Sequence, residues 1–98
     1  MPEENPILEF EEDSLRGKLF NFAEIPEKWH EGDYIAELDH YSILEALNES
    51  AEGVDVDVFE DGGPGISGSF YSVYATDVAT FKLKLTQKLL GLLQASDQ

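Results

Sequence analysis

Residues 53–77 read GVDVDVFEDGGPGISGSFYSVYATD, and this stretch decides the fold. At its start, three valines alternate with Asp55 and Asp57. Successive side chains of a strand point to opposite faces, so the pattern predicts a strand with valines in the core and carboxylates in water. The glycines of residues 62–68 predict a flexible connection, and residues 70–75 predict the return strand of an antiparallel hairpin.

The N-terminal part predicts further strands and a loop. Apolar side chains in residues 7–10 and 15–22 suggest two short strands, joined by an acidic turn at 11–14. Residues 23–33 contain Pro and Gly and predict a loop, in which Trp29 is the one large apolar side chain that can anchor it.

Two segments predict helices. Asp39 is a good N-cap, and the apolar side chains that follow it at helical spacing predict a helix over residues 40–50. In the last segment the apolar residues fit both strand alternation and helical spacing. Asp77 as an N-cap, with three lysines after it, favours a helix over residues 78–94, because cations suit the C-terminal half of a helix.

These elements predict a single α+β domain over residues 1–98, frayed at 1–5 and 95–98. Its expected architecture is an antiparallel sheet of about four strands with two helices packed on one face. No apolar run is long enough to span a bilayer, and no apolar segment follows a basic N-terminus. The chain also lacks cysteine, which suits a reducing compartment, so the expected location is cytoplasmic.

The net charge of -15 is unevenly distributed. No Lys or Arg occurs between Lys28 and Lys82. That interval carries twelve carboxylates: Glu31, Asp33, Glu37, Asp39, Glu45, Glu49, Glu52, Asp55, Asp57, Glu60, Asp61 and Asp77. Such a surface either keeps the protein soluble or steers a basic partner toward it. Phosphate backbones and anionic lipids would be repelled, so neither direct nucleic-acid binding nor membrane binding is expected.

The sequence contains no recognisable catalytic or cofactor motif. The glycines of residues 62–68 are not followed by the Lys-Ser/Thr pair of a phosphate-binding loop, and a strand rather than a helix is expected after them. The acids that begin at Asp55 do not have calcium-loop spacing, and His30 and His40 do not have the spacing of a helical zinc site. We therefore expect a protein that is not an enzyme and has no catalytic residue, metal or cofactor.

The residues expected to bind a partner lie in and beside the predicted hairpin. They are Asp55, Asp57, Glu60, Asp61 and Tyr71. The carboxylates would meet basic groups of the partner, and Tyr71 would serve as an aromatic anchor. The alternative for the acids is a merely solvated strand face, and for the tyrosine an aromatic ring packed under a helix.

Two parts of the chain resemble known families. Residues 54–77, VDVDVFEDGGPGISGSFYSVYATD, resemble an element of small acidic bacterial toxin-immunity proteins. That resemblance implies an inhibitor whose carboxylates occupy a toxin's basic cleft in place of nucleic-acid phosphates. Residues 75–93, ATDVATFKLKLTQKLLGLL, look like the last strand and helix of the small dimerising subunit of the KEOPS tRNA-modification complex, with Lys82 at the place of that helix's basic residue.

Two functions are therefore expected. The first is an acidic inhibitor or immunity-type protein that occludes a basic protein, such as a toxin, a nuclease or another nucleic-acid-binding protein, by mimicking nucleic-acid charge. The second is a structural subunit of a multiprotein complex such as KEOPS, in which the helix over residues 78–94 packs against a twin or another subunit. A monomer fits the first and a homodimer the second.

Overall fold

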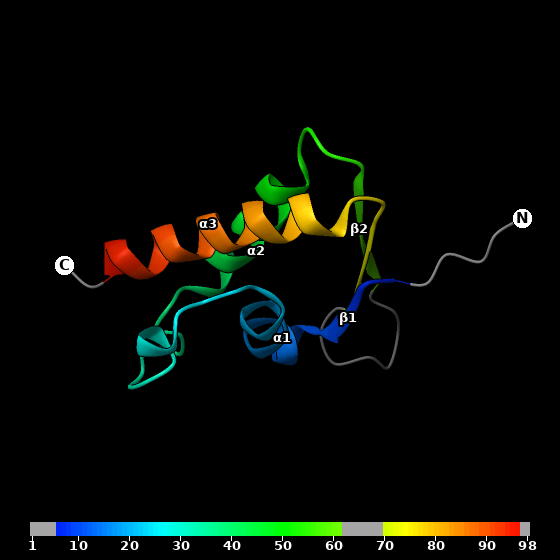
Figure 1. The fold of residues 1–98 in the computed structure, drawn as a ribbon. Coiled ribbons are helices and arrows are strands. Elements are labelled where there is room, and N and C mark those ends of the chain that lie inside the picture. The colour runs from blue at the N-terminus through cyan, green and yellow to red at the C-terminus, as the bar shows by residue number, and fades with distance from the viewer. Residues whose placement is uncertain (1–5, 62–69, 97–98) are drawn as a thin grey trace, which may run out of the picture.

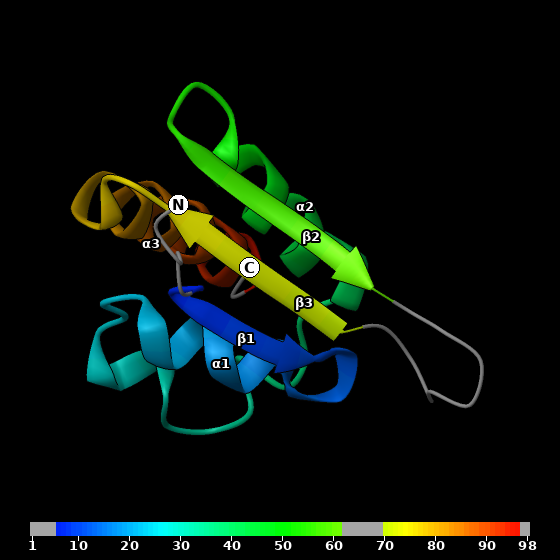
Figure 2. The same ribbon diagram turned by 90° about the vertical axis from the view of Figure 1, so that its right-hand side faces the viewer.

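The computed structural model describes residues 6–61 and 70–96, in which helices pack against one face of a small sheet (Figures 1 and 2). In chain order the elements are β1 (Leu8–Glu11), α1 (Leu15–Phe22), α2 (His40–Ala51), β2 (Val56–Asp61), β3 (Phe70–Ala75) and α3 (Val78–Ser96). Short 3-10 turns occupy Glu12–Ser14 and Glu27–Trp29. The α+β class is confirmed, but these ranges form three strands and three helices instead of about four and two.

The strands are ordered β1-β3-β2, and both neighbouring pairs are antiparallel. The predicted hairpin is confirmed, because β2 pairs with β3 and the return strand covers the expected residues 70–75. β2 begins at Val56, two residues after the first alternating valine. The connection predicted at residues 62–68 lies outside the described residues.

The second strand predicted in the N-terminal part is wrong, because residues 15–22 form helix α1. Leu15 and Leu19 are four residues apart and both are buried, as helical spacing allows. As a strand, the segment would have placed Gly17 and Asn21 on the face of these leucines. Neither strand face would then have been continuously apolar, so the helix is the way to bury the leucines without the polar residues between them.

The two predicted helices are confirmed. α2 begins after Asp39, whose carboxylate accepts a hydrogen bond from the Ser42 N–H at 3.2 Å, as an N-cap should. α3 presents four fully buried side chains at intervals of four residues, which resolves the ambiguity of its sequence in favour of a helix: Phe81, Leu85, Leu89 and Leu93. It continues to Ser96, two residues past the predicted end.

The core lies between the sheet and the helices. Val73 on the central strand is fully buried, as are Ile43 and Leu47 on α2. Trp29 is 5% exposed and belongs to this core, which confirms that it anchors the loop before α2. None of the helices in residues 6–61 and 70–96 is long and apolar enough to cross a membrane.

Candidate partner-binding face

The sheet has one face against the helices and one that the helices leave uncovered (Figure 2). Side chains that alternate with the buried Tyr71 and Val73 of β3 point to the uncovered side, as do their partners in the antiparallel register. We call this side the open face. Its side chains are those of Glu9, Glu11, Asp57, Phe59, Phe70, Ser72 and Tyr74.

Aromatic rings give the open face an apolar centre. Phe59 is 56% exposed, although it lies within a strand. Its ring packs edge-on against Tyr74 of the neighbouring strand, with the ring centroids 5.6 Å apart. Phe70 and Tyr74 are half-buried. An exposed aromatic pair with acidic neighbours offers both apolar contact area and charge to a binding partner.

The basic residues are confined to the helical layer, although that layer also carries acids such as Glu45 and Glu49 of α2. All six basic residues lie in helical segments: Arg16, Lys18, Lys28, Lys82, Lys84 and Lys88. None of the three described strands carries a basic residue, whereas β1 contributes Glu9 and Glu11 to the open face and β2 contributes Asp57. The open face is consequently acidic around its aromatic centre.

Most of the basic side chains make contacts within the helical layer. Lys88 Nζ lies 2.9 Å from Glu49 Oε1, and Lys84 Nζ donates to the Glu52 carbonyl at 2.5 Å. Arg16 Nη2 donates to the Leu38 carbonyl at 2.5 Å. The ammonium groups of Lys28 and Lys82 lie over the rings of Trp29 and Phe22, at 4.7 and 5.1 Å from the ring centroids. These contacts keep the cations away from the open face.

The structure brings two of the expected binding residues together. Asp55 and Asp57 line a hollow of about 80 Å³ beside Tyr74 and Thr76. The Thr76 hydroxyl donates to Asp55 Oδ2 at 2.6 Å and thereby orients that carboxylate. Both aspartates are exposed, whereas Val56 and Val58 pack against the core, which confirms the predicted alternation within β2.

The other three expected residues are placed differently. Tyr71 is only 4% exposed; it stacks on Phe10 at 5.3 Å and donates its hydroxyl to Glu60 Oε2 at 3.4 Å. Its ring belongs to the core and offers no anchor on the surface, so that part of the expected site is corrected. Glu60 is exposed, although it lies on the same side of β2 as Val56 and Val58, which face the core. Asp61 ends β2, and its side chain lies outside the described part of the chain.

Phe59 and Tyr74 were missing from the expected site. The sequence contained the signal for Phe59, since it lies two and four residues after Asp57 and Asp55 and must share their face. Tyr74 was recognisable only through the register, which sets it opposite Asp57. Either set of alternate residues of β3 could have faced the core, because both contain an aromatic side chain. The fold places Tyr71 and Val73 on the core side.

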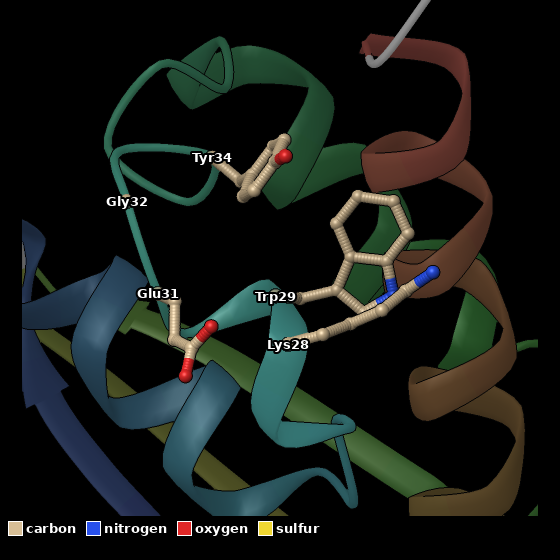
Figure 3. A pocket seen from close by; sticks show the side chains of 5 residues that line it. All are labelled: Lys28, Trp29, Glu31, Gly32 and Tyr34. Carbon is tan, nitrogen blue, oxygen red and sulfur yellow. The ribbon is translucent and has the colours of Figure 1, made fainter.

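A second hollow lies beside the anchored loop and has a volume of about 390 Å³. Figure 3 shows its lining side chains, Lys28, Trp29, Glu31 and Tyr34, together with Gly32. Tyr34 packs edge-on to the indole at 5.1 Å, and the Lys28 ammonium covers the indole ring. These contacts use the aromatic surface to hold the loop, so the hollow is better explained by packing than by ligand binding.

A third hollow, of about 570 Å³, lies along the start of α3. It is lined by Glu24, Val78, Ala79, Lys82, Leu83 and Thr86. Leu83 is 59% exposed there. Within residues 6–61 and 70–96, no group of three or more His, Asp or Glu side chains is arranged to hold a metal ion.

Comparisons with protein-family models, with curated proteins and with solved structures find no match to this chain.

Proposed function

We propose that this protein is a binding module that engages a basic protein through the open face of its sheet, as an inhibitor or immunity-type protein. The observation that carries the proposal is the combination on that face of an exposed aromatic pair with carboxylates and no basic side chain. A basic partner would gain charge pairs at the rim and apolar contact at Phe59. An active site that binds nucleic acid is basic, so such a site fits this charge pattern.

The proposal predicts a loss of affinity when Asp57 of the open face and the neighbouring Asp55, which lines the same hollow, are neutralised. Affinity capture would compare the wild-type protein with the double variant Asp55→Asn, Asp57→Asn, and a partner protein retained only by the wild type would be purified. Each desolvated charge pair contributes to binding. The dissociation constant of the complex with this partner should therefore rise at least about tenfold in the double variant, or about 1.4 kcal/mol.

A charge-matched control separates the open face from total charge. Glu37→Gln with Glu45→Gln also removes two negative charges, but from exposed positions in the loop before α2 and on α2. The control should bind like the wild type. Equal weakening by both double variants would mean that only net charge matters and would overturn the assignment of the open face.

A second candidate function is a dimerising subunit, as the likeness of residues 75–93 to the KEOPS subunit implies. The observation that favours it is Leu83, which is 59% exposed on α3 beside the third hollow. Light scattering coupled to size exclusion separates the candidates. A dimer that dissociates in the Leu83→Glu variant supports the subunit, and a monomer supports the inhibitor.

A further inference from the structure

β2 forms one edge of the sheet, so the main-chain N–H and C=O groups of every second residue point away from β3. The Thr76 N–H donates to the Asp55 carbonyl at 3.2 Å, which makes these two a hydrogen-bonded pair of the antiparallel ladder. Hydrogen-bonded and non-hydrogen-bonded pairs alternate, and Val58 is opposite Val73 in a non-hydrogen-bonded pair. The N–H and C=O of Val58 therefore point away from β3, toward the outer edge.

This edge lacks several of the features that block strand addition. Proteins protect edges with proline, charged side chains such as lysine, bulges or very short strands, and the charged side chains of β2 are all acidic. β2 has six residues without proline or lysine, and its register runs unbroken from Val56↔Ala75 to Asp61↔Phe70. The other edge strand, β1, has only four residues. Among the described strands, β2 is therefore the better template.

The charge of the edge selects what can pair with it. Asp57 lies in β2 and Asp55 just before it, so a second copy of this strand would bring carboxylate against carboxylate. An extended segment with Lys or Arg would instead place cations beside these acids. Their hollow, with Tyr74 and Thr76, lies next to the same strand and could receive the tip of one such side chain.

We infer that the outer edge of β2 accepts an extended Lys- or Arg-bearing segment of a protein partner as a fourth strand, with main-chain hydrogen bonds centred on Val58. This inference rests on the proposed function, for which it supplies the mode of binding. Basic residues at every second position would lie on the open face, where their charge meets Asp57 and their aliphatic part covers Phe59. The partner segment is thus expected to alternate basic and other residues.

The test uses a synthetic peptide of alternating Lys and Val, as long as the six residues of β2. Amide exchange of the intact protein is followed by NMR with peptide at ten times its dissociation constant. Exchange occurs from the unbound fraction, so the Val58 N–H should slow about tenfold. A peptide with the same charge but N-methylated at alternate residues cannot form the ladder and should give no protection. A peptide with Glu in place of Lys should not bind.

Two results would overturn the inference. Equal binding by the N-methylated peptide without protection of Val58 would show that basic segments lie on the open face without adding a strand, which leaves the proposed function standing. Absence of binding by the Lys peptide would also reject the edge. The proposed function fails separately, if the purified partner binds the Asp55→Asn, Asp57→Asn variant as tightly as the wild type.

Discussion

Asp77 stands immediately before α3 and titrates differently from an ordinary aspartate. Its carboxylate accepts hydrogen bonds from the Thr80 hydroxyl at 2.6 Å and the Thr80 N–H at 3.1 Å. These bonds stabilise the ionised form, with the hydroxyl bond contributing most, and hold the pKa of Asp77 below its ordinary value of 3.8. The interaction is therefore strongest where the carboxylate is fully charged.

The lowered pKa predicts the sign of a pH dependence. A group with a depressed folded-state pKa adds stability above its unfolded pKa and loses it as the pH falls through the folded value. Relative to Asp77→Asn, which keeps a capping oxygen but does not titrate, the wild type should lose its advantage in melting temperature below the ordinary value of 3.8. Carboxyl NMR should show the Asp77 pKa rising in Thr80→Ala. An advantage that persists unchanged into strong acid would contradict this account.

Helix α1 is the element that the sequence pattern did not predict, and its glycine offers a direct test. Gly17 lies inside α1, and a Cβ added there would meet no atom within 4 Å. Alanine is the best helix former, so Gly17→Ala should stabilise the protein by about 0.5–1 kcal/mol in urea unfolding.

The matched control for this substitution is Gly53, between α2 and β2. It has a φ of +76°, which alanine adopts only with strain. Gly53→Ala should therefore cost about 1–2 kcal/mol. Destabilisation by Gly17→Ala of the same size as that by Gly53→Ala would be incompatible with a helix over residues 15–22.

The whole molecule carries a net charge of -15, and its cations are confined to the helical layer, so no cation opposes the acids around the aromatic centre of the open face. This net charge would attract the proposed basic partner from beyond contact distance. Salt screens charges over about 8 Å near 0.15 M, so the association rate with the partner should fall steeply as ionic strength rises. Stopped-flow measurements test this, and a rate indifferent to salt would rule out steering.

Prediction from the sequence succeeded where local pattern and local chemistry agreed. The alternation around Asp55 and Asp57 predicted the inner and outer faces of β2, and the Asp39 cap predicted the start of α2. It failed at residues 15–22, where leucines and aromatics are mixed with Gly17 and polar residues. A short apolar run of this kind fits either element, and burial against the rest of the fold makes the choice.

By itself, the sequence determined the α+β class, the hairpin of β2 and β3, the helices α2 and α3, and the acidity of the exposed positions between the valines. These features depend on periodicity, capping and charge, which are properties of neighbouring residues. Only the tertiary structure decided that β3 is the central strand, that Tyr71 is buried, and that Phe59 meets Tyr74 on an uncovered face. Strand order and phase depend on which distant side chains share a core, and no local pattern records that choice.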